Sequence, residues 1–138
     1  MTEGISVDFV ILCDSAQVQG NKLYMLGGGW SQITARQLPT QHGFTVAAGI
    51  LVPWMDTNVR HRFELQIRAE DGGVLAQAQG EFEQGRPPGL LPGSAQRFMV
   101  AINLSVRIEK PCEALLELSL DGNLAKTVPF RIVQQPTR

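Results

Sequence analysis

The stretch RHRFELQIRAEDGGVLAQAQGEFE, residues 60–83, decides the fold class. In its first ten residues, apolar side chains such as Phe63 and Leu65 alternate with polar ones, which is the two-residue period of a half-buried strand. Asp71-Gly72 follows, a dipeptide typical of the tight turn in a β-hairpin, and the alternation resumes beyond it. The sequence therefore predicts an antiparallel hairpin over residues 60–83.

Charge favours one register for this hairpin. A two-residue loop pairs Glu70 with Gly73 and then places Arg62 opposite Glu81 on the polar face. Such an exposed pair contributes only about 0.2–1 kcal/mol, so its main effect is to specify which residues face each other.

The rest of the chain repeats the strand pattern on both sides of this hairpin. Further runs with strand character lie at residues 5–13, 22–26, 30–35, 44–52, 98–108, 112–120 and 124–133. Residues 44–52 are apolar on both parities, which predicts a central strand covered on both faces. No segment shows a sustained helical period. The expected fold is all-β: a single-domain antiparallel β-sandwich of about eight or nine strands over residues 1–138, immunoglobulin-like or jelly-roll-like.

The last two runs are predicted to form a hairpin with a three-residue turn. A two-residue turn would mix apolar and polar residues on one face. A turn over residues 121–123 with Asn123 in the left-handed conformation instead pairs Leu120 with Leu124 and Leu116 with Val128.

Composition excludes several classes of function. The 138 residues carry a formal net charge of −1 and have a pI of about 6.1, so there is no basic footprint for nucleic acid. No apolar run is long enough for a membrane helix, and the N-terminus lacks the pattern of a signal peptide. We expect a soluble cytoplasmic protein with no nucleic-acid or membrane partner. Cys13 and Cys112 are expected to be free thiols.

The segment after the predicted central strand is a candidate ligand site. It contains Trp54, Asp56 and Asn58, and His61 follows at the start of the next strand. An amphipathic tryptophan beside polar side chains at a sandwich end suits a small-molecule or carbohydrate ligand. The same loop could instead cap the core, and His61 shares the parity of Phe63, which favours a hydrogen-bonded core histidine.

Residues 85–93, GRPPGLLPG, form the least regular segment. The prolines restrict its conformations, and exposed leucines would form an apolar patch of the kind that interfaces use. A crossover whose leucines fold back onto the sandwich is the alternative. The candidate partner interface comprises Arg86, Pro87, Pro88, Leu90 and Leu91.

No arrangement of residues predicts catalysis, a cofactor or a metal. Gly27-Gly28-Gly29 lacks the Gly-Lys-Ser/Thr and the helix of a phosphate-binding loop. His42 and His61 are the only histidines, and they are not at the spacing of metal ligands. Ser15 and the two cysteines lack the sequence context of activated nucleophiles.

These observations predict a non-enzymatic interaction or accessory module that forms a homo-oligomer or binds a protein partner. Its sheet edges would need covering, which supports this hypothesis. The alternatives are a small-ligand or carbohydrate-binding sandwich with its site between residues 54 and 61 and, less favoured, a metal-dependent enzyme that uses His42 and His61.

Several short motifs made of turn and strand-edge residues extend over nearly the whole chain. They are Asp14-x-Ala16, Asn21-Lys22-Leu23-Tyr24 with Gly27-Gly28, Pro53-Trp54 with Asn58, Gly80-x-Phe82-x-x-Gly85-Arg86-Pro87-Pro88, and Asp121-Gly122 leading to Pro129-Phe130. In these motifs the chain resembles a bacterial family of short all-β proteins known only as a domain of unknown function. The resemblance implies an all-β fold and assigns no activity.

Overall fold

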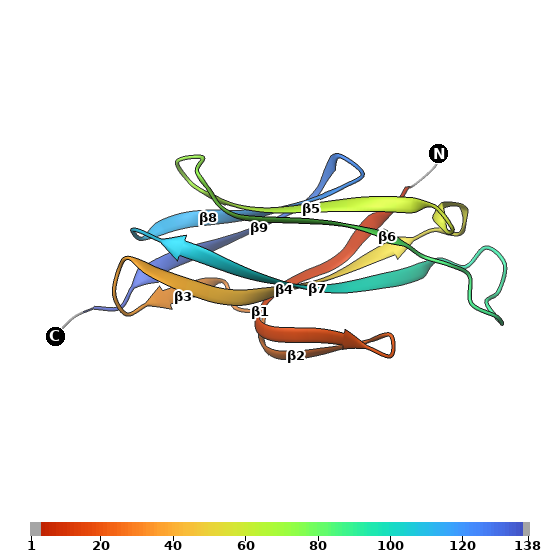
Figure 1. Cartoon of the computed structure of the whole chain (residues 1–138), viewed down its shortest axis with the longest axis horizontal. Helices are drawn as coiled ribbons and strands as arrows, with labels where there is room; N and C mark the ends of the chain where they lie inside the picture. Colours follow the sequence, from red (N-terminus) through yellow and green to blue (C-terminus); the bar gives the residue numbers. More distant parts are fainter. Residues whose placement is uncertain (1–3, 137–138) are drawn as a thin grey trace.

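Residues 4–136, which the computed structural model describes, form nine strands in two sheets (Figure 1). One sheet has the order β2-β1-β4-β7 and the other β3-β9-β8-β5-β6. The elements are β1 (Ser6–Gln19), β2 (Lys22–Gly28), β3 (Gln32–Ala35), β4 (Thr40–Val52), the 3-10 helix η1 (Trp54–Asp56), β5 (Arg60–Ala69), β6 (Val74–Glu83), β7 (Gln96–Ile108), β8 (Cys112–Leu120) and β9 (Asn123–Gln134). Within residues 4–136, no helix has the length and apolar character needed to cross a membrane.

The core lies between the inner faces of the two sheets. Val46 and Ile50 of β4 and Leu65 and Ile67 of β5 are at most 1% exposed and belong to one apolar cluster. β4 pairs with β1 on one side and β7 on the other, which confirms the predicted central strand. Its outer face is also buried, because residues such as Ala47 are small and the neighbouring side chains cover them. The all-β class is therefore confirmed, and the choice between an immunoglobulin-like and a jelly-roll-like type stays a prediction.

The β5–β6 hairpin has the predicted register along most of its length. Arg62 faces Glu81, and the pairing holds as far as Ile67. The predicted two-residue loop is wrong, because the register shifts beyond Ile67 and the connection comprises residues 70–73. The Asp71 carboxylate accepts a hydrogen bond of 2.8 Å from the Gly73 amide, which stabilises the wider turn.

The β8–β9 hairpin also has the predicted pairing in its body, where Leu116 faces Val128. The predicted three-residue turn is wrong: Leu120 faces Asn123 across a two-residue turn, and the register shifts later, beyond Leu118. Asp121 itself is left-handed, with φ of 50°. Its carboxylate is held by contacts with β5, which favour that conformation at Asp121 instead of at Asn123.

Three features depart from the expected antiparallel pattern and strand bounds. β3 pairs with β9 in parallel, so the sandwich is not wholly antiparallel. β1 continues past Cys13 to Gln19, and that second half forms a hairpin with β2. Trp30 lies before β3 and packs edge-on against Phe44 and Phe130 of the core.

Candidate functional site

Two connections meet at one end of the long axis of the molecule. One joins β4 to β5 through η1, and the other is the segment 85–93 between β6 and β7, called here the Pro-rich loop (Figure 1). These two connections contain the nine residues predicted to bind a ligand or a partner, except that His61 lies just inside β5. The fold therefore brings both candidate sites to the same end.

Arg86 joins the two connections. Its guanidinium lies 3.7 Å from the centroid of the Trp54 ring and donates hydrogen bonds of 2.7 Å to the Trp54 carbonyl and 2.6 Å to Thr57 Oγ1. Thr57 is buried and in turn donates to the same Trp54 carbonyl. The arginine thus uses both its charge and its planar donor geometry to hold the Pro-rich loop against η1.

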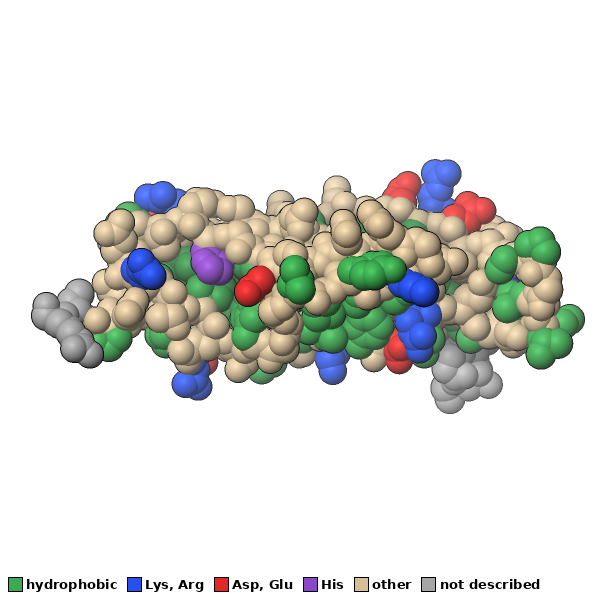
Figure 2. All heavy atoms as spheres, turned by 90° about the horizontal axis from the view of Figure 1, so that it is seen from below, with side chains coloured by type: hydrophobic (Ala, Val, Ile, Leu, Met, Phe, Trp, Pro, Cys, Tyr) green, Lys and Arg blue, Asp and Glu red, His purple; other side chains and the backbone are tan. Residues whose placement is uncertain are grey.

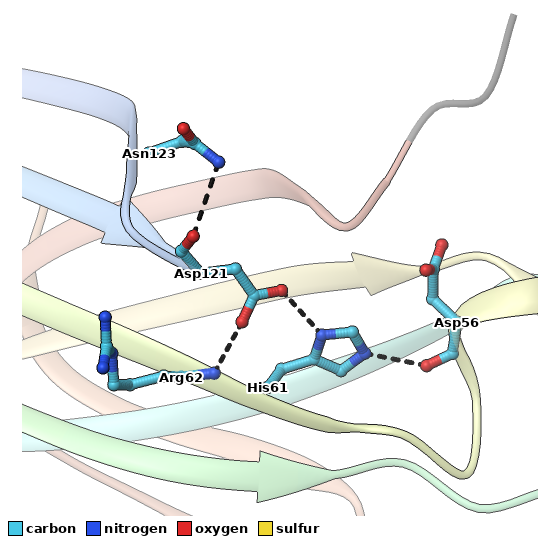
Figure 3. Close-up of polar contacts among 5 residues, drawn as sticks. All are labelled: Asp56, His61, Arg62, Asp121 and Asn123. Carbon is cyan, nitrogen blue, oxygen red and sulfur yellow. Dashed lines mark hydrogen bonds and ion pairs between the residues drawn. The ribbon is translucent and has the colours of Figure 1, made fainter.

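His61 is 4% exposed, and both of its ring nitrogens have partners (Figure 3). Nε2 lies 2.8 Å from the Asp56 carbonyl oxygen, and Nδ1 lies 2.8 Å from Asp121 Oδ2. Both partners are acceptors, so only the doubly protonated ring can donate to both. Burial lowers the pKa of His61, but these hydrogen bonds and the nearby carboxylates outweigh it, and the pKa is raised overall.

Asp121 completes the link between η1, β5 and the β8–β9 turn. Its other carboxylate oxygen accepts a 2.9 Å hydrogen bond from the Arg62 amide. Burial raises the pKa of Asp121, but the hydrogen bonds from His61 and Arg62 outweigh it, so the pKa is lowered overall. A protonated histidine and an ionised aspartate are therefore the favoured pair.

The four predicted ligand residues mainly hold their own loop in place. Trp54 is covered by Arg86, and the His61 ring is engaged at both nitrogens. Asn58, with φ of 59°, donates its backbone amide to the Gln84 carbonyl. Asp56 contacts His61 through its backbone, while its carboxylate points away and has one buried oxygen without a partner among the described residues (Figure 3).

The Pro-rich loop consists of two successive turns of the same kind. The Leu90 amide donates to the Pro87 carbonyl at 3.3 Å, and the Ser94 amide donates to the Leu91 carbonyl at 3.1 Å. Each turn has Pro-Gly at its centre, and the two glycines have φ of 88° and 85°. This is the chemistry of type II turns, in which proline fixes the second residue and glycine supplies the positive φ of the third.

The two leucines of this loop have different environments. Leu90 is partly buried, whereas Leu91 is 75% exposed. Pro87 and Pro88 are also exposed. The sequence left two alternatives for these leucines: exposure to solvent, or packing back onto the sandwich. Leu91 is exposed to solvent, whereas Leu90 is partly buried.

An open groove of about 650 Å³ runs beside the Pro-rich loop. Arg86 and Pro87 line it together with Gln84, Gln96, Arg97 and Met99. The alternation along the strands does not predict this groove, because the two ends of the β6–β7 connection line it together with Asn21 of the β1–β2 turn.

The histidines and cysteines lie apart from one another. His42 is on β4 near Phe44, whereas His61 is on β5 in the other sheet. Within residues 4–136, no three His, Cys, Asp or Glu side chains are placed to hold one metal ion. Cys13 and Cys112 are free thiols, and burial raises the pKa of both.

Comparisons with known proteins place the chain in a family. A bacterial adhesin from Mobiluncus mulieris, which contains intramolecular disulfide, isopeptide and ester bond cross-links, has a similar fold, with a TM-score of 0.51 and 7% sequence identity. The alignment covers 94% of this chain and 58% of the adhesin chain, and at that identity it shows the fold alone. No curated protein matches the sequence. The model of the "Family of unknown function (DUF6941)" matches residues 8–133, so the chain belongs to that family, which confirms the resemblance seen in its motifs.

Proposed function

We propose that this protein is a non-enzymatic interaction module that contacts a second copy of itself or another protein through the Pro-rich loop. The observation that supports this most directly is the 75% exposure of Leu91 on a loop built from two Pro-Gly turns.

A single exposed leucine is ordinary on a protein surface, but an exposed leucine in an uncharged, proline-rich loop is less common. Leu91 stands beside the exposed Pro87 and Pro88, and residues 87–96 contain no charged side chain. Figure 2 shows hydrophobic side chains gathered at the end where this loop projects. When such a surface binds a partner, its apolar area is removed from water. This burial is the main driving force of most protein association.

The loop is also held in its conformation before any partner arrives. The two turns fix its backbone, and Arg86 fixes its base against Trp54 and Thr57. Binding then costs little conformational entropy, so a small apolar contact retains more of its free energy. Rigidity and exposure together support a role in recognition.

Sedimentation velocity on the purified chain tests this proposal. The wild type should sediment faster as its concentration rises, and Leu91→Asp should remove that dependence. Leu124→Asp is the matched control, because Leu124 is 59% exposed on a different hairpin. A wild type that stays monomeric at high concentration, or an unaffected Leu91→Asp variant, would contradict self-association through this loop.

A second candidate function is binding of a small polar ligand such as a carbohydrate. The groove beside the Pro-rich loop favours it, because Arg86 both lines the groove and covers Trp54. A saccharide panel should then give saturable changes in tryptophan fluorescence that Trp54→Phe removes. Retention of the full signal in that variant, or the lack of any saturable change, would count against this function.

A further inference from the structure

We propose that Leu91 of one copy inserts into an apolar pocket at the opposite end of a second copy, so that copies join head to tail. The inference rests on the proposed function and names the surface that the Pro-rich loop binds. The pocket lies between the β5–β6 turn, the β7–β8 turn and the last residues of β9.

This pocket is small and mainly apolar. Its volume is about 160 Å³, and Ile108 and Ile132, which are 1% and 2% exposed, contribute to it from the core. Val74, the first residue of β6, also lines the pocket and is 48% exposed. The other apolar lining residues are Ala69, Leu75 and Cys112.

The pocket has the size that a leucine side chain needs. An apolar cavity of about 150 Å³ holds a benzene ring, and the four carbons of a leucine side chain occupy less space. Inserting Leu91 would cover its own exposed surface together with that of Val74. Each copy carries both an exposed leucine and an apolar pocket. A second copy can therefore bury the leucine of the first and, with its own leucine, fill the pocket of a third.

Charges at the two ends have opposite signs. Asp71, Glu109 and Lys110 line the pocket, and Glu109 forms an ion pair of 2.7 Å with Arg107. Around Cys112 in the pocket, the carboxylates of Glu70, Asp71 and Glu113 outnumber the one nearby cation, Lys110, so negative charge predominates there. The Pro-rich loop has one charged residue, Arg86, and among residues 4–136 no carboxylate forms an ion pair with it. This complementarity favours pocket-to-loop contact over contact between two loops.

The positions of the two surfaces determine the kind of assembly. The Pro-rich loop projects from one end of the long axis, and the turns around the pocket lie at the other end (Figure 1). A contact between different surfaces at opposite ends of an elongated subunit leaves one of each surface free. The expected product is an open linear chain of copies rather than a closed symmetric dimer.

Native Cys112 in the pocket allows a direct test by cross-linking. Leu91→Cys, oxidised with copper phenanthroline, should give a ladder of covalent oligomers on a non-reducing gel. Adding Cys112→Ser should remove the ladder, while Cys13 is 0% exposed and should not react. A dimer band that persists after Cys112→Ser would show loop-to-loop contact and overturn the proposal. Leu124→Cys is the control for random collision.

A mixing experiment separates failure of this inference from failure of the proposed function. Val74→Asp should block the pocket and Leu91→Asp the loop, so each variant alone should be monomeric. Mixed in equal amounts they should form a dimer, because the intact loop of one meets the intact pocket of the other. If Val74→Asp associates like the wild type while Leu91→Asp does not, the loop is an interface but this pocket is not its partner. A monomeric wild type overturns both.

Discussion

His61 and Arg86 each connect segments that lie far apart in the sequence. His61 links η1 to the β8–β9 turn through Asp56 and Asp121, and Arg86 links the Pro-rich loop to Trp54. Both use a cationic side chain with more than one donor, which is how a single residue can fix two neighbouring backbones. The order of this end of the molecule therefore depends on a few polar contacts as well as on the apolar core.

The contribution of the His61–Asp121 pair to stability should fall as pH rises above 6.5. The pKa of His61 is raised above its ordinary value of 6.5, so its contribution is full below pH 6.5 and is lost as pH rises through the folded-state pKa. The pKa of Asp121 is lowered below 3.8, so its contribution is full above pH 3.8 and is lost as pH falls through the folded-state pKa. The pair is thus most effective between about pH 4 and 6.

Urea unfolding at pH 5.5 and pH 8.5 measures this effect. Asp121→Asn keeps a residue that tolerates the left-handed turn but removes the carboxylate, so the difference in unfolding free energy between the two pH values should shrink. An equal difference in the wild type and the variant would show that the pair does not contribute.

Removing the Arg86 side chain should loosen the Pro-rich loop. Arg86→Ala deletes the contact with the Trp54 ring and two hydrogen bonds, which together contribute about 1–2 kcal/mol. Limited proteolysis should cut the loop faster in this variant, and Trp54 fluorescence should shift to longer wavelength. Arg60→Ala, which removes a charge from an exposed pair with Glu81, is the control and should leave both readouts unchanged. Equal cleavage of Arg86→Ala and the wild type would show that Arg86 does not anchor the loop.

At the scale of the elements, the close packing of β1 on β4 requires glycine at one position. A Cβ at Gly49 would overlap the ring of Phe9, whereas a Cβ at Gly43 in the same strand would be 3.7 Å from its nearest neighbour. Gly49→Ala should therefore destabilise the protein by about 1–3 kcal/mol, as overpacking does in cores. Gly43→Ala should be nearly neutral, and thermal unfolding compares the two. Equal melting temperatures would contradict this account of the packing.

Local alternation predicted the strands and the bodies of both hairpins, because the side-chain period is present in neighbouring residues. Arg62 lies opposite Glu81 as predicted, but the ion pairs differ: Arg60 contacts Glu81, and Arg62 contacts Glu64. Local alternation placed the extra residues of both hairpins wrongly. In the β8–β9 turn, the deciding contacts come from His61 and Arg62, which lie about sixty residues away in sequence. The parallel pairing of β3 with β9 was missed for the same reason, since a four-residue strand carries no record of a distant partner.

The candidate sites were predictable only as residue types. Trp54, Arg86 and Leu91 stand out in the sequence as an amphipathic ring, a cation and an apolar side chain in loops. Their contacts depend on how two connections meet in space, which local sequence does not record. Arg86 covers Trp54, and Leu90 is more buried than Leu91. The pocket at the other end was not predicted, because three separate segments form it.

At the scale of the whole molecule, the two-layer sandwich separates two unlike surfaces along its long axis. One end carries the Pro-rich loop, and the β5–β6 and β7–β8 turns lie at the other end (Figure 1). Leu91 is exposed on the loop, and the apolar pocket lies between the two turns. Under the proposed contact between the Pro-rich loop and the pocket, copies would join in a line.

Small-angle X-ray scattering of the wild type over a range of concentrations tests association through the Pro-rich loop most directly. The account predicts that the overall radius of gyration grows with concentration while the cross-sectional radius stays constant, because copies add along the long axis. Leu91→Asp should keep the monomer dimensions throughout. A constant overall radius in the wild type, or a cross-section that thickens as the particles grow, would contradict the account.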